Sequence, residues 1–329
     1  MTTLSHILSN PDWLPHQIDP SGKEMLFVRL ARDEFNAHAF LANQTGTDQQ
    51  WVSINDLHGA RLQTGPASFI FHSGFCRSTL LLRALSVEGK VRGLNEPEIL
   101  NSLSRLADPG DDLIALVIDL LSRPHSAGAA VVIKPSNFQN RLIPKIMATR
   151  KGMRAILLTN ALDEFLWAIV RKGLLGRQWG RQTYLVAASY AGQVDGFAAH
   201  IPGMTDLQVA ALGWLLMQNW FETSQGDIGA SRAAVLHSSH FDQNRAATIR
   251  SSAAHLELGL HECDISAILD GPVFATDAKT GSDYATKEAR DIERSRSAVT
   301  ADEIREVCAW IGELARVSGL AVPLKQTLC

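Results

Sequence analysis

Short apolar runs bounded by breaker residues recur along the chain at 68–72, 91–94, 129–133, 155–158 and 233–236. Their apolar residues are near-continuous rather than alternating, which is typical of strands that are buried on both faces of a sheet. Helical patterns lie between and after them, at 78–88, 97–107, 111–123, 138–150, 161–175, 205–224, 241–258, 284–297 and 301–317. This alternation of strands and helices predicts an α/β fold with a central parallel sheet and right-handed crossovers.

The two ends of the chain follow a different pattern. Residues 1–60 are mixed in character and predict a helical, loop-rich N-terminal cap, which belongs to the same domain as residues 61–329. Residues 270–283 are rich in Gly, Asp, Thr and Ser and predict a loop. Thr300 is followed three positions later by Glu303, a spacing that fits a capping box and predicts that the last helix begins there.

Composition and charge narrow the class of protein. The chain has 329 residues, of which 46% are hydrophobic and 20% charged, as in a soluble globular protein. Its formal net charge of -3 provides no basic excess for nucleic acid or an anionic membrane, so we expect neither partner. No apolar run approaches the roughly 18 residues of a transmembrane helix, and no signal-peptide pattern opens the chain.

Cysteine and histidine spacing predicts no metal. Four cysteines lie far apart without a CxxC motif, so the sequence indicates neither a zinc site nor a disulfide framework. His237 and His240 have no third ligand at metal spacing. We therefore expect a cytoplasmic protein without a metal, and the sequence leaves its oligomeric state open.

The stretch "FIFHSGFCRSTLLLRAL" at 69–85 carries the first sign of chemistry. A strand runs into a small-residue loop, and the loop runs into a helix. Backbone N–H groups and the dipole at a helix N-terminus stabilise an anion there. Ser78 and Thr79 would add hydroxyl donors at the helix start, so the stretch favours a phosphate site, although such turns occur in any doubly wound fold.

Later segments strengthen this interpretation. The loop is followed by "NEPEIL", "VVIKPSN", "AILLTNALDEFLWAIVRKG" and "ATDAKTGSDY". In order and spacing these segments resemble the sulfotransferase-like P-loop family, most closely a bacterial branch, over roughly residues 65–317. The resemblance implies a three-layer α/β fold with helices on both faces of the sheet. It also implies metal-independent transfer of a sulfuryl group from 3′-phosphoadenosine 5′-phosphosulfate (PAPS) to a hydroxyl or amine of a small-molecule acceptor.

The family loop, G-x-P-R-S-G-T-T-L-L, can be aligned in two registers. One keeps Arg77 and Ser78 on the family's Arg-Ser but deletes two residues. The other equates residues 72–79 with the full loop, and we prefer it because a loop that wraps one phosphate cannot easily be shortened. His72 then replaces the first glycine and Arg77 the internal one. Three roles stay open for Arg77: a phosphate ligand, an obstruction of the loop, or a solvated residue at the helix start.

The resemblance assigns the donor site to this loop. The residues concerned are Ser73, Gly74, Phe75, Cys76, Arg77, Ser78 and Thr79. Cys76 can alternatively be read as a small packing residue.

Three residues are candidates for catalysis. Glu96 follows the second predicted strand, where strand ends line a ligand crevice, and some branches of the family place a proton-accepting glutamate there. Glu96 fits better than Glu98 because it precedes Pro97, which is expected at the first helical position; alternatively it is a carboxylate stabilised by the helix dipole.

Lys134 ends an apolar strand and would stabilise charge on the bridging oxygen, or would be a snorkelling surface lysine. His72 is an alternative acid or base, or a structural histidine at a strand end. Ser136 and Asn137 follow Lys134 and would cap a helix or touch the acceptor.

One family motif is missing. The pattern R-D-P-x-x-x-x-x-S holds the 3′-phosphate of PAPS in the family, but Thr159 stands at the Arg position and Trp167 or Ala168 at the Ser position. Arg171, with the cations that follow it, would replace these contacts or form a solvated helix end. Lys279 would belong to the basic C-terminal loop that closes over the nucleotide in the family.

Two other functions remain. A diverged P-loop protein that binds an anion or nucleotide without catalysis is consistent with Arg77 and the lost motif. A P-loop kinase or NTPase is less favoured because G-K-[ST] is absent and Asp119, in "LIALVID", lies in a helical context.

Overall fold

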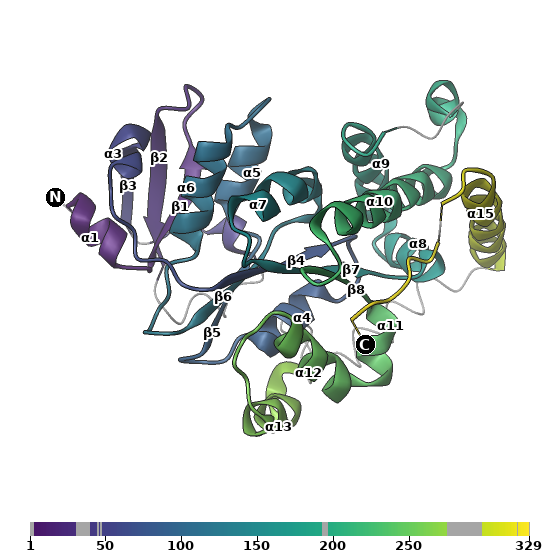
Figure 1. The fold of residues 1–329 in the computed structure, drawn as a ribbon. Coiled ribbons are helices and arrows are strands. Elements are labelled where there is room, and N and C mark those ends of the chain that lie inside the picture. The colour runs from purple at the N-terminus through teal and green to yellow at the C-terminus, as the bar shows by residue number, and fades with distance from the viewer. Residues whose placement is uncertain are drawn as a thin grey trace.

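The computed structural model describes residues 3–30, 40–44, 46, 48–192, 197–274, 298–320 and 322–328. At its centre is a five-stranded sheet in the order β5-β6-β4-β7-β8, and each neighbouring pair is parallel (Figure 1). The strands are β4 (Ala67–His72), β5 (Val91–Asn95), β6 (Ala130–Lys134), β7 (Arg154–Thr159) and β8 (Ala233–His237). The prediction of a parallel α/β sheet is confirmed. The strands are almost wholly buried, as their continuous apolar sequences predict.

Helices cover both faces of this sheet. One face packs against α5 (Glu98–Arg105), α6 (Asp111–Leu121) and α7 (Ile143–Thr149), and the other against α4 (Ser78–Leu85), α12 (Arg245–His255) and α13 (Glu262–Asp270). Successive residues of β4 separate accordingly: Phe69 and Phe71 join the first hydrophobic cluster, and Ile70 joins the second. The result is the expected three-layer arrangement.

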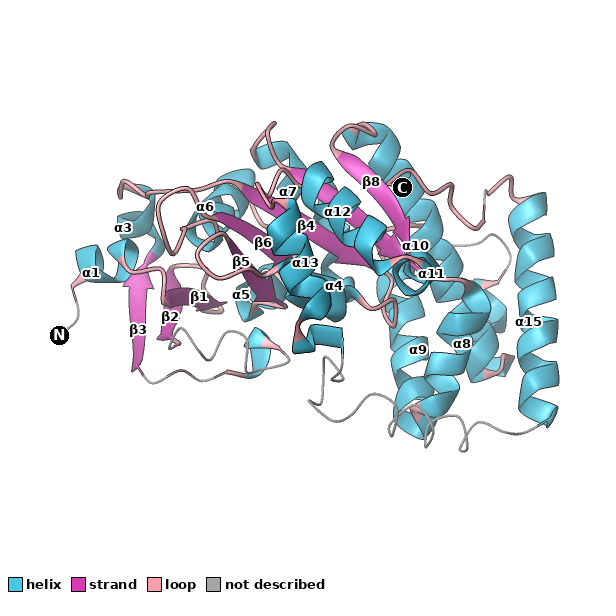
Figure 2. Ribbon diagram, turned by 90° about the horizontal axis from the view of Figure 1, so that it is seen from below, coloured by secondary structure: helices cyan, strands magenta, loops and turns pink. Residues whose placement is uncertain are grey.

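The remaining helices lie mostly beyond β7 and β8, on the side away from β5. They are η2 (Asn137–Leu142), α8 (Leu162–Arg171), α9 (Gly173–Ala188), η3 (Ala198–Gly203), α10 (Asp206–Ile228), α11 (Ser238–Gln243), η4 (Pro272–Phe274) and α15 (Ala298–Val317). Figure 2 shows α8, α9 and α15 together at one end of the molecule. None of the helices within the described ranges has both the length and the apolar character needed to cross a membrane.

Several predicted helix bounds were wrong. The pattern at 161–175 stops at α8, and a separate helix, α9, begins at Gly173, whose φ of 60° breaks the first one. The pattern at 241–258 divides into α11 and α12 at Asn244, whose side chain accepts from the N–H of Ala247 and caps the second helix. Thr300 is not an N-cap, because α15 already begins at Ala298. The helix predicted at 284–297 lies outside the described residues.

The N-terminal region differs most from its prediction. Instead of a helical, loop-rich cap it forms a three-stranded antiparallel sheet of β1 (Trp13–Ile18), β2 (Glu24–Arg29) and β3 (Asp48–Ser53). The short elements α1 (Leu4–Ser9), η1 (Leu41–Asn43) and α3 (Ile54–His58) accompany it. The alternation of apolar and polar residues that would predict these strands is weak. Pro15 lies at an irregular register in β1, and most of β3 is exposed. Side chains of β2 nevertheless join the same hydrophobic cluster as β4.

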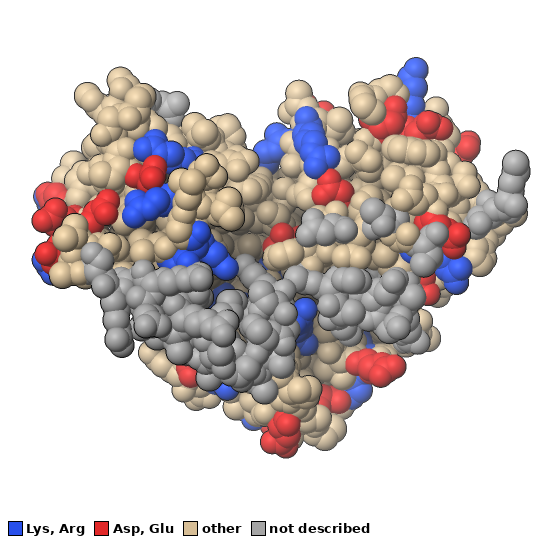
Figure 3. Space-filling model, turned by 180° about the vertical axis from the view of Figure 1, so that it is seen from behind, with Lys and Arg blue, Asp and Glu red and all other residues tan. Residues whose placement is uncertain are grey.

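The surface carries charges of both signs. In the view of Figure 3, Lys and Arg side chains lie among Asp and Glu side chains over the described part of that face. This distribution agrees with the small net charge of the chain.

A buried arginine ties the N-terminal segment to the central layers. Arg123 follows α6, and its guanidinium donates to the carbonyl oxygens of Ile7 (2.7 Å), Leu8 (3.1 Å) and Trp13. Two of these carbonyls belong to the last turn of α1, where no intrahelical donor is available. Burial lowers the pKa of Arg123 to about 10, so the side chain stays charged at neutral pH.

Replacement of Arg123 by methionine should therefore destabilise the fold strongly. We expect Arg123→Met to lower the free energy of unfolding by about 2–5 kcal/mol, because it leaves several buried carbonyls without a donor. Arg105→Met is the matched control: its side chain is 61% exposed and pairs with Glu98 at the surface, so a loss below about 1 kcal/mol is expected. Urea unfolding measures both, and equal losses would contradict the role of Arg123.

Candidate functional site

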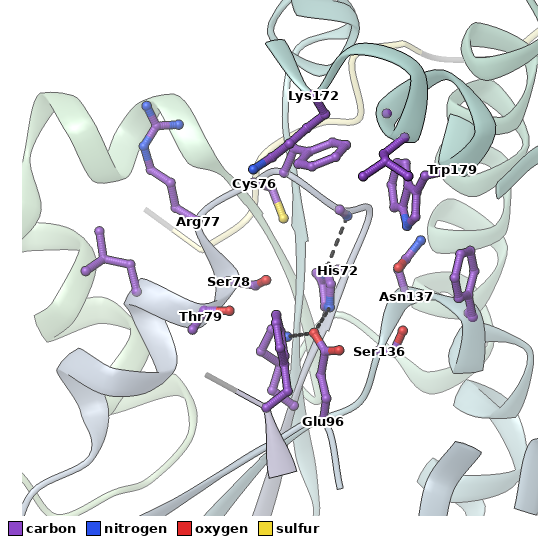
Figure 4. A pocket seen from close by; sticks show the side chains of 18 of the residues that line it. His72, Cys76, Arg77, Ser78, Thr79, Glu96, Ser136, Asn137, Lys172 and Trp179 are labelled. Atoms are coloured by element: carbon purple, nitrogen blue, oxygen red, sulfur yellow. Dashed lines mark hydrogen bonds and ion pairs between the residues drawn. The ribbon is translucent and has the colours of Figure 1, made fainter. Parts of the chain in front are cut away.

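A cavity of about 640 Å³ opens at the carboxyl ends of β4, β5 and β6 (Figure 4). The predicted loop residues 74–79 line it, and so do all three predicted catalytic residues, His72, Glu96 and Lys134. Three segments that are far apart in the sequence are thus brought to one edge of the sheet, as parallel strands require.

The loop between β4 and α4 has an unusual backbone. Gly74, Phe75 and Arg77 have positive φ values of 92°, 53° and 63°. Arg77, which the preferred register equates with an internal glycine, adopts the left-handed conformation that glycine favours. The first N–H groups of α4 have no intrahelical acceptor, and they start at this turn. The loop has the shape of an anion cradle.

The Arg77 side chain is held outside this cradle. Its guanidinium lies 2.7 Å from Asp242 Oδ2 on α11, and Figure 4 shows it directed away from Glu96. Burial raises the pKa of the Asp242 carboxyl, an effect that Arg77 opposes. The Arg77 side chain is therefore engaged in an ion pair, and its three possible roles stay predictions.

Buried side chains fix the shape of the loop from beneath. His72 Nδ1 accepts from the N–H of Gly74 (3.1 Å), and Nε2 lies 3.1 Å from the carbonyl oxygen of Pro135. Nε2 therefore carries the ring proton in this arrangement. Asn160, which follows β7, donates to the carbonyls of Gly74 (3.3 Å) and Phe75 (3.4 Å). These contacts make His72 and Asn160 positioning residues for the loop.

Ser73 and Cys76 face the interior. The Ser73 hydroxyl donates to Asn160 Oδ1 at 3.1 Å, and Ser73 is not among the residues that line the cavity. Cys76 lines the cavity but is itself buried, and its thiol lies 3.5 Å from the carbonyl oxygen of Leu158. Burial raises the pKa of the Cys76 thiol, so it is not a thiolate at neutral pH.

An ion pair forms the floor of the cavity. Lys134 Nζ lies 2.5 Å from Glu96 Oε1, and the lysine side chain is 0% exposed whereas that of Glu96 is 19% exposed. His72 Nε2 is 3.9 Å from the same carboxylate oxygen. Asn95 lies opposite Lys134 in the register of β5 and β6. Glu96 directly follows Asn95, so this register places Glu96 and Lys134 side by side. Glu98, the alternative candidate, instead pairs with Arg105.

The backbone of Glu96 is strained, and its conformation places the carboxylate against Lys134. Its φ is 51°, a left-handed value that is costly for a residue other than glycine. Its N–H donates to the carbonyl oxygen of Lys134 (2.7 Å), and its own carbonyl accepts from the N–H of Ala42 (3.0 Å). Pro97 follows as the residue that caps α5 rather than as its first helical residue.

Two buried polar atoms on the cavity wall have no hydrogen-bond partner within the described part of the chain. They are Thr79 Oγ1, at the start of α4, and Asn137 Nδ2, in η2. Other buried polar atoms of the described residues also lack a partner, but these two belong to residues that line the cavity, which makes them candidates for contact with a ligand. Sequence reasoning named Thr79 for the donor site, and named Asn137 as a capping or acceptor-contacting residue.

Aromatic rings form the wall near α9. Trp179 lies 4.6 Å from Phe75 and 6.0 Å from Phe138 between ring centroids. A Cβ atom built on Gly74 would come within 2.6 Å of the Trp179 ring, so glycine is needed there for space as well as for its positive φ. The sequence analysis missed Trp179 because it did not identify α9.

The predicted cations are only partly at the site. Lys172 lines the cavity, whereas Arg171 does not. Arg245, which the sequence analysis did not single out, also lines the cavity and lies 5.0 Å from the ring centroid of Phe274. Arg177 and Arg181 approach Asp206 instead. Lys279 lies outside the described residues.

The segment at 159–168 contributes no donor to the cavity. Thr159 is fully buried and exchanges hydrogen bonds with Gln218, with distances of 3.1 and 2.7 Å. Ala168 is buried, and Trp167 lines a different cavity. Among the residues with described positions, no group of three or more His, Cys, Asp or Glu side chains is arranged to hold a metal ion.

Comparisons with known proteins find similarity only among solved structures. No protein-family model matches the chain. No curated protein matches it either. The sulfotransferase domain from the curacin biosynthetic pathway is 12% identical, and the match covers 80% of this chain and 100% of that domain with a TM-score of 0.44. The sulfotransferase from Alicyclobacillus acidocaldarius is 12% identical, with 80% and 98% covered and a TM-score of 0.42.

The backbone conformation at Arg77 gives a direct test of the loop. We expect Arg77→Gly to retain about 1 kcal/mol more unfolding free energy than Arg77→Ala, because only glycine adopts a φ of 63° without steric cost. Both variants lose the Asp242 ion pair equally, so their difference isolates the backbone. Thermal and urea unfolding measure it, and an alanine variant as stable as the glycine variant would show that the loop is not held in this conformation.

Proposed function

We propose that the protein is a sulfotransferase that moves a sulfuryl group from PAPS to a hydroxyl or amine of a small-molecule acceptor. The observation that carries the proposal is the placement of the Glu96–Lys134 pair and the loop at the start of α4 on one cavity (Figure 4). The ordered motifs of the sequence, which resemble the sulfotransferase-like P-loop family, support it independently.

The loop side of the cavity suits the 5′-phosphosulfate of the donor. Backbone N–H groups and the helix dipole at the start of α4 favour an anion there. The unsatisfied Thr79 hydroxyl and the neighbouring Ser78 supply further donors. Lys172 and Arg245 add positive charge on the same cavity.

Glu96 and Lys134 suit the transfer step as a coupled pair. The Glu96 carboxylate accepts the proton of the acceptor hydroxyl, whose oxygen then bonds to sulfur. The bond between sulfur and the bridging phosphate oxygen breaks, and its electron pair leaves with the phosphate. Once Glu96 is neutral, the ammonium of Lys134, 2.5 Å away, is available to stabilise the negative charge that develops nearby. His72 acts in this proposal by shaping the loop.

A kinase or NTPase is less well supported. Asp119, the only candidate for a Walker B aspartate in the sequence analysis, lies within α6 and pairs with Arg150. The loop at 72–79 contains no lysine to reach β- and γ-phosphates.

A diverged protein that binds the donor anion without catalysis is the second candidate. The observation that favours it is the segment at 159–168, where Thr159 is bonded to Gln218 and supplies nothing to the cavity. A 3′-phosphate would then depend on other cations, such as Lys172 or Arg245.

Calorimetry and turnover together test these alternatives. The intact protein is titrated with 3′-phosphoadenosine 5′-phosphate (PAP), the product, and with ATP plus magnesium, and PAPS consumption is then followed over time. We expect binding of PAP and slow consumption of PAPS. PAP binding without any PAPS consumption would favour the non-catalytic protein, a response to Mg-ATP alone would favour the NTPase, and no response would overturn the proposal.

Glu96→Gln tests the assigned base. We expect PAPS consumption to fall by about 10²–10⁴-fold, because the amide cannot accept the proton, while the affinity for PAP changes by less than about threefold. Glu98→Gln is the matched control, since this carboxylate lies two positions away, pairs with Arg105 and does not line the cavity. Unchanged turnover in Glu96→Gln, measured beside the control, would remove Glu96 from catalysis.

A further inference from the structure

The acceptor side of the cavity has a chemistry of its own. Phe75, Phe138 and Trp179 are half-buried, and all three line the cavity. Trp179 contacts both phenylalanine rings and fills the space beside Gly74, so its ring is fixed against the loop. A rigid wall of tilted rings favours a flat apolar molecule, which stacks against it at little entropic cost.

One polar group interrupts this wall. Asn137 lies between Trp179 and Ser136 in Figure 4, and its side chain is buried. Its amide Nδ2 has no partner among the described residues. A buried amide N–H is costly to leave unpaired, so it selects a molecule that places an oxygen acceptor there. Ser136 is the other neighbouring polar residue that lines the cavity.

The charges on this side balance. Glu96 and Lys134 neutralise one another at 2.5 Å. Lys172 lies near Cys76, toward the loop end of the cavity in Figure 4. Arg77 is paired with Asp242, also beyond the loop. Among the residues whose positions are described, those between Asn137, Trp179 and Glu96 thus carry no net charge, which favours a neutral molecule over an anionic or cationic one.

We propose that the acceptor is a neutral, planar phenol that carries a second oxygen, such as a carbonyl or ether, at the far end of its ring. The phenolic hydroxyl meets Glu96, the ring stacks on Trp179 and Phe138, and the second oxygen accepts from Asn137 Nδ2. This inference rests on the proposed sulfotransferase function. It makes Asn137 a specificity-determining residue.

Two physical arguments favour a phenol over other hydroxyl compounds. A carboxylate is a weak base, and phenolic hydroxyls, with a pKa of about 10, give up their proton far more readily than aliphatic alcohols do. A sugar brings several hydroxyl groups that each need a partner, whereas this wall offers Asn137, Ser136 and otherwise aromatic surface.

The transfer step balances with the donor already named. The phenolic oxygen forms a bond to sulfur, and its proton passes to Glu96. The bond from sulfur to the bridging oxygen breaks, and that oxygen keeps the electron pair as PAP is released. The products are an aryl sulfate, PAP and the proton held by Glu96.

An acceptor panel with the intact protein tests the inference. The acceptors are 4-(methoxymethyl)phenol, 4-ethylphenol, 4-ethylcyclohexanol and methyl glucoside, each with PAPS, and kcat/KM is measured for each. The two phenols have similar acidity, so we expect 4-(methoxymethyl)phenol to exceed 4-ethylphenol by about tenfold, which is the effect of one buried hydrogen bond. The cyclohexanol and the glucoside should react at least about 100-fold more slowly than either phenol.

Variants of Asn137 provide the second readout, the ratio between the two phenols. We expect Asn137→Leu and Asn137→Asp to reduce this ratio from about 10 to about 1, because neither side chain donates to the ether oxygen. Asn137→Leu should fold, since it removes a donor that has no partner to lose. Asn101→Leu is the control: Asn101 donates to Glu98 outside the cavity, and the ratio should stay near 10.

The outcomes separate this inference from the proposed function. Absence of PAP binding would overturn both. PAP binding with faster transfer to the glucoside or the cyclohexanol, or PAPS consumption that no phenol accelerates, would overturn the acceptor class and leave the sulfotransferase proposal standing. A phenol ratio that survives in both Asn137 variants would overturn the role of Asn137.

Discussion

The burial of one ammonium group constrains much of the site. Lys134 has no exposure to water, so its charge requires a carboxylate within contact distance, and Glu96 provides it at 2.5 Å. The parallel register of β5 and β6 places Asn95 beside Lys134, and the left-handed turn at Glu96 then brings the carboxylate over the lysine. Even η1 takes part, because Ala42 donates to the carbonyl of Glu96. The ion pair therefore links strand register, backbone strain and the N-terminal region.

Backbone strain is concentrated around the cavity. Four residues other than glycine have positive φ within the described ranges, and Phe75, Arg77 and Glu96 all line this one cavity. Strained residues persist only where their surroundings hold them, and here His72 and Asn160 hold the loop. The cavity is thus shaped before any ligand enters, which is the condition for electrostatic stabilisation without reorganisation.

The sequence predicted the central sheet well because its strands are continuous apolar runs that are bounded by breakers. It predicted Glu96 and Lys134 at one edge because strand ends must meet there. It did not predict the antiparallel β1–β3 sheet, whose exposed strand β3 lacks an apolar pattern. Nor did it predict α9, where glycines interrupt the helical pattern, and Trp179 was missed with it. The ion pair of Arg77 with Asp242 joins residues 165 positions apart, and no local sequence pattern predicts such a contact.

The contact between Gly74 and Trp179 also bears on how the chain is made. The loop between β4 and α4 is encoded in the first quarter of the sequence, yet the ring that packs against Gly74 belongs to a helix that begins about a hundred residues later. During synthesis the loop emerges from the ribosome well before that helix, and Asn160, which ties the loop from beneath, also follows later. The nascent chain therefore carries the loop sequence for some time without the loop's shape, and the site is completed only when α9 docks.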